Sequence, residues 1–184
     1  MLKKFAVVII IIFLVTIISG CTETPKEMKE ITIEGHTETY TFANDIRESL
    51  KVPVNDEFGI RQMFLENDRF NIVFDGSSMQ DNAYFRIVLI NLAKISIFFS
   101  YESKVIGFDY YYYVGEQWYN STNENITIPE LHNVIWLKGP STGAIDTSLT
   151  LNGSTVYLQG TDYKNLTLAG DKLTLLVFGI DRVD

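Results

Sequence analysis

The sequence predicts an α+β fold with a mixed, mainly antiparallel sheet, helices on one face of that sheet, and one long core helix over about residues 81–99. Segments that alternate apolar and polar residues recur along the chain. Between Asp81 and Phe99 the apolar residues are too dense for a surface helix. Asn152-Gly153 between two alternating segments is a strong hairpin signal. We expect residues 31–184 to form a single globular domain.

Composition excludes several classes of protein. A chain of 184 residues that is 46% hydrophobic can build a core without disulfides or metal. A single cysteine forms neither an internal disulfide nor a zinc cluster. The net charge of −8 argues against nucleic acid as a partner. We expect no cofactor, because the Gly139–Gly143 segment contains a proline and lacks the Lys-Ser/Thr that follows a phosphate-binding loop.

The first 20 residues have the features of a signal peptide. Lys3 and Lys4 precede an apolar run from Phe5 to Ile18. This run is shorter than the roughly 20 residues of a membrane span. It ends in Ile18-Ser19-Gly20-Cys21, where small residues precede the only thiol of the chain. An uncleaved N-terminal anchor is the alternative interpretation.

This segment resembles the lipobox of prokaryotic lipoproteins, with Ile18 in place of the usual leucine. The resemblance implies lipidation of Cys21 and attachment to the outer face of the cytoplasmic membrane, because two lipid chains on one residue anchor a protein stably. Residues 21–30 are polar and contain Pro25, which indicates a tether between the lipid and the domain.

The first half of the expected domain alternates short strands and helices. Residues 31–33 and 39–42 predict a hairpin across Gly35-His36. Asn44 is placed to cap a short helix that ends near Leu50, and apolar spacing predicts a second helix over 56–66. A strand over 69–74, the long helix and a strand over 104–114 form a candidate parallel crossover. A membrane span at 81–99 is the less favoured alternative for the long helix.

The second half is predicted to be mostly strands. The polar segment 115–130 indicates a loop, and 134–137 a short strand. Residues 148–151 and 155–158 flank the hairpin turn. The apolar segment 172–180 predicts a buried closing strand.

Two longer stretches resemble small uncharacterised archaeal surface lipoproteins. They are WLKGPSTGAIDTSLTLNGSTVYLQGTDYKNLTLAGDKLTLLVFGI at 136–180 and VFDGSSMQDNAYF at 73–85. The resemblance implies a surface lipoprotein of archaeal type, and it implies no chemistry.

The turn after the 69–74 strand offers one candidate binding site. Asp75, Ser77, Ser78 and Asp81 stand where a strand leads into a helix, a place where amides and hydroxyls meet ligands. The segment is similar to the metal-ion-dependent adhesion site of von Willebrand factor A domains at Asp75 and Ser77. Met79 departs from that pattern, since a thioether is a poor magnesium ligand, so we expect no metal. A helix cap at Ser78 or Asp81 is the simpler interpretation.

Carboxylates provide the main catalytic alternative, ahead of a Ser-His-Asp assembly. Asp75, Asp81 and Asp109 could converge for acid–base or metal chemistry if the fold brought them together. Neither His36 nor His132 lies near a serine in a nucleophile motif.

Aromatic residues form the most unusual segment. Tyr110 to Tyr113 lie on a predicted strand, where Tyr110 and Tyr112 face one side and the intervening pair the other, and Trp118 follows. Exposed rings with polar rims suit sugar or peptide binding. We therefore take Tyr110, Tyr112 and Trp118 as candidate binding residues, with burial in the sheet as the alternative.

Four sequons could accept N-glycans on exposed segments: Asn120, Asn125, Asn152 and Asn165. Together these features favour a membrane-anchored extracytoplasmic lipoprotein that binds a carbohydrate, a peptide or an envelope protein without catalysis. A cell-envelope hydrolase using carboxylates around Asp75 and Asp109 is the alternative, and a subunit of a transporter complex is a third possibility.

Overall fold

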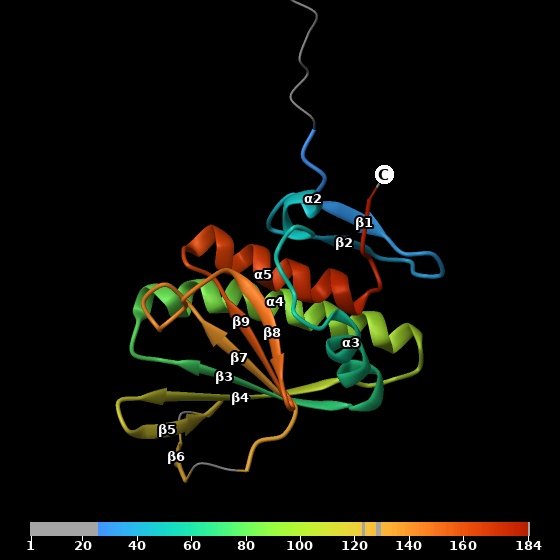
Figure 1. Ribbon diagram of the computed structural model, residues 1–184. Helices are drawn as coiled ribbons and strands as arrows, with labels where there is room; N and C mark the ends of the chain where they lie inside the picture. The colour runs from blue at the N-terminus through green and yellow to red at the C-terminus, as the bar shows by residue number, and fades with distance from the viewer. Residues whose placement is uncertain (1–25, 123, 128–129, 184) are drawn as a thin grey trace, which may run out of the picture.

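The computed structural model describes residues 26–122, 124–127 and 130–183. Its main feature is a seven-stranded sheet in the order β6-β5-β4-β3-β7-β9-β8 (Figure 1). The strands of this sheet are β3 (Arg69–Asp75), β4 (Gly107–Val114), β5 (Gln117–Asn120), β6 (Asn125–Ile126), β7 (Val134–Lys138), β8 (Ser148–Asn152) and β9 (Thr155–Gln159).

The sheet is parallel at its centre and antiparallel at its flanks. Strands β4, β3, β7 and β9 run parallel, β5 and β8 pair antiparallel with β4 and β9, and β6 pairs antiparallel with β5. The mixed sheet of an α+β fold is thereby confirmed. The expected crossover is present, because β3 and β4 pair in parallel on either side of the long helix. A separate antiparallel hairpin joins β1 (Glu30–Thr32) to β2 (Thr39–Thr41).

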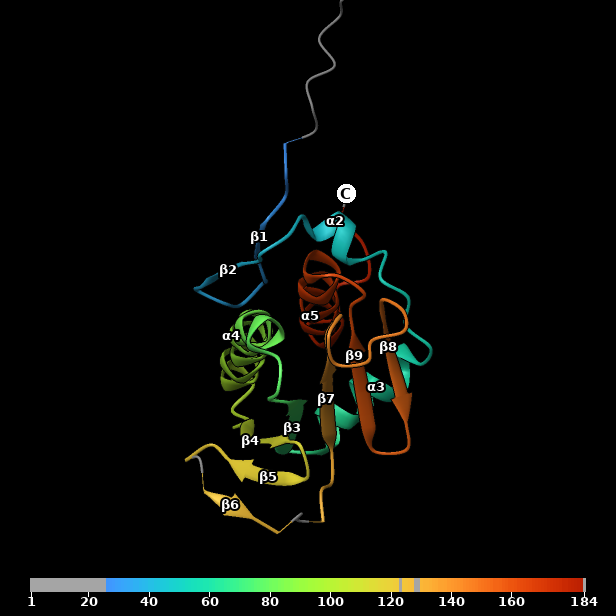
Figure 2. The ribbon, with the colours of Figure 1, turned by 90° about the vertical axis from the view of Figure 1, so that its left-hand side faces the viewer.

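The two longest helices lie side by side on one face of the sheet (Figure 2). The expected long core helix is α4 (Met79–Tyr101), which packs Val88 and Leu92 into the core. Of the helices in the described residues, α4 is the one long and apolar enough to cross a membrane by length and composition. Its buried side instead contacts α5 (Tyr163–Val177). The shorter helices are α2 (Ile46–Ser49) and α3 (Glu57–Glu66).

The expected closing strand at 172–180 is wrong, since most of this segment belongs to α5. Asp162 begins the helix by accepting a hydrogen bond from the Asn165 amide at 2.7 Å. Every residue of α5 from Leu166 onward is buried, including Thr167 and Asp171. A helix surrounded on all sides has no polar stripe, so its apolar run has the same pattern as a buried strand.

Two smaller expectations are also corrected. The loop expected at 115–130 contains strands β5 and β6, because Trp118 and Tyr119 pair with β4 and β6 pairs in turn with β5. Asp45 caps α2 in place of Asn44, since the Asp45 carboxylate accepts from the Arg47 amide at 2.9 Å. The expected helix at 56–66 and the hairpin at Asn152-Gly153 are confirmed.

Both edges of the sheet are short or covered. On the β8 edge, Leu149 donates to the Pro53 carbonyl at 2.9 Å, and its own carbonyl accepts from Asn55 at 3.2 Å. The Asn55 side chain also accepts from the Leu151 amide at 2.8 Å. The opposite edge strand, β6, has only two residues.

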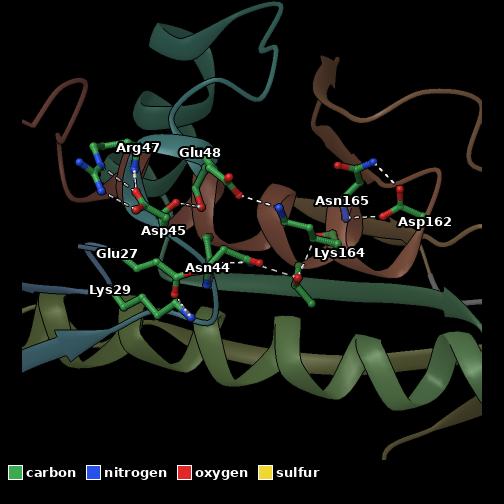
Figure 3. A network of polar contacts seen from close by, with 12 residues as sticks. Glu27, Lys29, Asn44, Asp45, Arg47, Glu48, Asp162, Lys164 and Asn165 are labelled. Carbon is green, nitrogen blue, oxygen red and sulfur yellow. Dashed lines mark hydrogen bonds and ion pairs between the residues drawn. The ribbon is translucent and has the colours of Figure 1, made fainter. Parts of the chain in front are cut away.

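The first described residues are fixed to α2 and α5 by a polar network (Figure 3). Asp45 accepts from the Met28 amide at 3.1 Å, and Arg47 donates to the Lys26 carbonyl at 2.8 Å. Glu48 continues the network to α5 through an ion pair with Lys164 at 2.8 Å. The last part of the expected tether at 21–30 therefore packs on the domain. Figures 1 and 2 both place this end of the molecule opposite β5 and β6.

Candidate functional site

The face of the sheet opposite α4 and α5 carries a group of aromatic side chains. Strand alternation sends one set of residues, such as Ile72, Leu137 and Leu158, into the core beneath the helices. The alternate set points to the other face, where no described helix packs. We call its five rings the aromatic face: Tyr111, Tyr113, Trp118, Trp136 and Tyr157.

Four of these rings form a continuous row across strands β5, β4, β7 and β9. The ring centroids of Trp118 and Tyr113 are 5.2 Å apart. Tyr113 meets Trp136 edge-on at 6.4 Å, and Trp136 stacks on Tyr157 at 6.0 Å. Aromatic pairs at these spacings stabilise one another. All five side chains remain partly exposed, so the row is fixed in position yet accessible.

The rings also cover apolar residues that would otherwise face solvent. Val73 and Val134 point to the same side of the sheet as Trp136, and both are buried although no described helix covers them. In the register, Val73 lies between Tyr111 and Trp136. The aromatic face therefore acts as its own cover, and this contact holds the rings in one geometry.

Polar groups border the row of rings. The Lys138 ammonium lies 5.0 Å from the centre of the Tyr157 ring. Burial, together with the hydrogen-bonded Asp75 carboxylate, raises the pKa of Tyr113, which keeps its hydroxyl protonated. Asn120 and Thr150 lie on the same face, paired with Tyr111 and Tyr157.

The structure places the aromatic residues that the sequence suggested for binding on two opposite sides of the sheet. Tyr110 and Tyr112 face the helices, where Tyr112 stacks on Phe74 at 5.7 Å and lines a hollow of about 330 Å³ beside Arg86. Trp118 lies on the opposite side with the other two tyrosines of the strand. The structure therefore brings Trp118 and Asp75 together but separates both from Tyr110 and Tyr112.

Sequence reasoning missed four members of the aromatic face: Tyr111, Tyr113, Trp136 and Tyr157. A usable signal existed for two of them. Trp136 and Tyr157 each lie on a strand two residues from a polar residue, Lys138 and Thr155 respectively. Side chains two residues apart on a strand point to the same side, so each ring shares its side with a polar group. What the sequence did not show is that β7 pairs with β9 and with β3, which places these rings beside those of β4.

Hydrogen bonds within the 75–81 segment stabilise the turn between β3 and α4. Asp75 accepts from the Ser77 amide at 2.8 Å, and Ser78 caps α4 by accepting from the Asp81 amide at 3.2 Å. The Asp81 carboxylate is buried and accepts from the Thr142 hydroxyl at 2.8 Å. Asp81 therefore ties the 139–142 turn to the first turn of α4, and it points away from the aromatic face.

The carboxylates of the alternative hypothesis do not converge. Asp75 pairs with Tyr113 and Asp109 with Asn71, so the two acids lie four positions apart along the strands. At the rise of a β-strand this is about 13 Å, beyond the roughly 5–9.5 Å that separates paired catalytic carboxylates. Within the described residues, no three His, Cys, Asp or Glu side chains are grouped to hold a metal ion.

The histidines lie away from the aromatic face. His36 hydrogen-bonds to the Tyr40 hydroxyl at 2.8 Å and stacks on Tyr101 at 4.2 Å, which packs the β1–β2 hairpin against α4. His132 is exposed, 3.8 Å from Glu130.

The four sequons differ in how their asparagines are held. Asn125 and Asn152 are exposed near the ends of β6 and β8. The Asn120 amide nitrogen donates to Glu124 at 3.0 Å, and that of Asn165 donates to Asp162 at 2.7 Å. Asn125 and Asn152 therefore present the amide nitrogen that would carry a glycan more openly.

Residues 1–25, including Cys21 and the expected signal peptide, lie outside the described residues. Comparison of the chain with family models, with curated proteins and with solved structures gave no match.

Proposed function

We propose that this chain is a membrane-anchored extracytoplasmic lipoprotein of archaeal type, lipidated on Cys21, whose domain binds carbohydrate on the aromatic face without catalysis. The observation that carries the binding role is the row of partly exposed rings from Trp118 to Tyr157 on the helix-free side of the sheet. Sugars present apolar C–H faces and hydroxyl groups together, and half-exposed rings bordered by polar groups match both.

Charge and position support this ligand class. A net charge of −8 disfavours polyanions such as nucleic acid, whereas a neutral glycan carries no such penalty. The described chain starts at the α2 end of the molecule, and β5 and β6 lie at the opposite end (Figures 1 and 2). A lipid on Cys21 would therefore hold this part of the aromatic face directed away from the membrane.

The anchor is tested by mass spectrometry of the membrane-extracted protein beside a Cys21→Ala variant. We expect the wild-type chain to begin at a lipid-modified Cys21 and the variant to lack that modification. An intact Met1 N-terminus with an unmodified thiol would refute the anchor and leave the binding proposal standing.

The binding role is tested by titrating the full chain in detergent micelles with soluble neutral polysaccharides, namely a glucan, a mannan and a galactan. We expect Trp118→Ala and Tyr157→Ala to weaken binding of the recognised glycan at least ten-fold. Phe58→Ala, on the exposed surface of α3, is the matched control and should bind as wild type does. Binding that survives both aromatic variants, or that is absent for every glycan, rejects the proposed ligand class.

A further inference from the structure

The exposed side of α4 carries an unusually apolar stripe. Its exposed residues, apart from Gln80, recur with alternating spacings of four and three along the helix: Met79, Ala83, Arg86, Ile90, Ala93, Ile97 and Ser100. Ile90 is 64% exposed and Ile97 is 45% exposed. Five of the seven are apolar, on the side of the helix where a soluble protein usually places polar residues. We call these seven residues the α4 stripe.

The apolar α4 stripe is a surface on which a second helix can pack. A four-three repeat is the a/d seam through which two helices pack side chains into each other's gaps. The two alanines allow the backbones to approach closely, and half-buried Ile87 and Leu89 widen the seam on either side. We infer that the α4 stripe is the interface of a homodimer, in which α4 packs antiparallel against α4 of a second copy.

The charge within the α4 stripe selects the antiparallel direction. In a parallel pair, Arg86 would face Arg86 of the other copy across the seam, and like charges repel. In an antiparallel pair centred between Ile90 and Ala93, each Ile90 faces the partner's Ala93, and each Ile97 packs against the aliphatic stem of the partner's Arg86. Large residues then meet small or flexible ones, which is the arrangement that fills space.

The direction of the chain supports the same choice, and this step rests on the proposed lipid anchor. Figures 1 and 2 together show that α4 runs across, and not along, the direction in which the first described residues leave the domain. A two-fold axis that makes two facing helices antiparallel keeps both chain starts on one side of the dimer. The axis that makes them parallel sends the starts to opposite sides. Two copies anchored in one membrane can therefore form only the antiparallel pair.

Cysteine cross-linking tests the interface independently of the anchor. A Cys21→Ser change removes the only thiol of the chain, so that any added cysteine is unique. Single Ala83→Cys and Ser100→Cys variants, both on exposed positions, are made in the full-length chain, with an affinity tag on one of them. They are reconstituted in neutral phosphatidylcholine vesicles, alone and mixed, and oxidised. An Ile145→Cys variant, at a residue 85% exposed outside the α4 stripe, is the control.

The antiparallel dimer predicts a disulfide in the Ala83→Cys and Ser100→Cys mixture, with no more than control-level product from either variant alone. Adding Ile90→Glu and Ile97→Glu should reduce the mixed product at least ten-fold, whereas adding Phe58→Glu should leave it unchanged. Cross-linking of each variant with itself would show a parallel pair and overturn the inference. Control-level product throughout would also overturn it, and the binding role of the aromatic face would be unaffected by either result.

Discussion

Trp136 of β7 stacks on Tyr157 of β9 with ring centroids 6.0 Å apart and 27° between the ring planes. Trp136 and Trp118 are the two tryptophans of the chain, and both belong to the aromatic face. The tryptophan fluorescence of the protein therefore arises where we propose that the ligand binds, and it reports binding without a label.

We expect a recognised glycan to change the tryptophan emission, because a bound sugar removes water from the indole rings. Trp118→Phe and Trp136→Phe should each remove part of the change while keeping an aromatic ring in place. The measurement is an emission titration, with N-acetyltryptophanamide as the control for inner-filter effects. Binding measured by calorimetry with no change in emission would place the ligand elsewhere.

We expect the domain to lose stability in acid because the Asp45 carboxylate becomes protonated. Hydrogen bonds from the Arg47 side chain lower its pKa well below the ordinary 3.8, with a further contribution from the Met28 amide. A lowered pKa means that the unfolded state takes up the proton first, so the stabilisation is complete above pH 3.8 and declines as the pH falls below it. Asp45→Asn should be less stable at pH 7, with the difference shrinking in acid.

Urea unfolding of the wild type and Asp45→Asn between pH 2 and 7 measures this dependence. Asp181→Asn, which removes an exposed carboxylate near the C-terminus, is the control for net charge. A difference between wild type and Asp45→Asn that stays constant with pH would contradict the role assigned to Asp45.

We expect Asp171 to have the opposite effect on how stability depends on pH. Its carboxylate is buried between α4 and α5, and burial raises its pKa although Asn44 donates to it at 2.8 Å and 3.0 Å. A raised pKa means that the folded state holds the proton more tightly, so stability falls as the pH rises from 3.8 through the folded pKa. The Asn91 side-chain NH2 group also donates to the Asp171 carboxylate. In Asp171→Asn, the new side-chain NH2 group can face this donor in place of an acceptor. The variant should be less stable near pH 4, and its deficit should shrink at higher pH.

The same urea series measures this effect, and the two variants control for each other. The deficit of Asp45→Asn grows as the pH rises, and the deficit of Asp171→Asn shrinks. Parallel behaviour of the two variants would show that general charge effects outweigh these sites.

Gly160 is required by close packing at the start of α5. A methyl group at this position would overlap the backbone of Leu166, which does not move without displacing the helix. We expect Gly160→Ala to destabilise the domain by about 1–3 kcal/mol, the usual cost of overpacking. Gly107→Ala is the control, because its nearest neighbour would be the Asp68 carbonyl at 3.9 Å. Thermal unfolding measures the stability of both variants. An equal loss of stability in the two would contradict this packing argument.

The sequence predicts most elements of this fold because local patterns determine them. Turn chemistry at Asn152-Gly153 and apolar spacing in α3 and α4 leave few alternatives. The exceptions are places where packing overrides pattern. Residues of α5 from Leu166 onward are buried, so the apolar run at its end has the composition of a buried strand. Strand β5 forms because β4 offers it a neighbour, and β6 pairs in turn with β5, although the segment around them is polar.

The aromatic face was only partly predictable for a related reason. Alternation correctly separated Tyr110 and Tyr112 from the other two tyrosines of β4, but it could not show which pair meets the helices. That outcome depends on where α4 packs, which no short pattern encodes. Trp136 joins the aromatic face only through the parallel pairing of β3 and β7, a contact between distant segments.

The covered edge at Leu149 and the two-residue strand β6 have a consequence for the behaviour of the protein at high concentration. An open row of backbone amides and carbonyls is a template on which other chains can add strand by strand. Here Pro53 and Asn55 occupy those groups on one side, and on the other too few residues remain to seed growth. Both edges of the seven-stranded sheet are therefore protected against the addition of further strands.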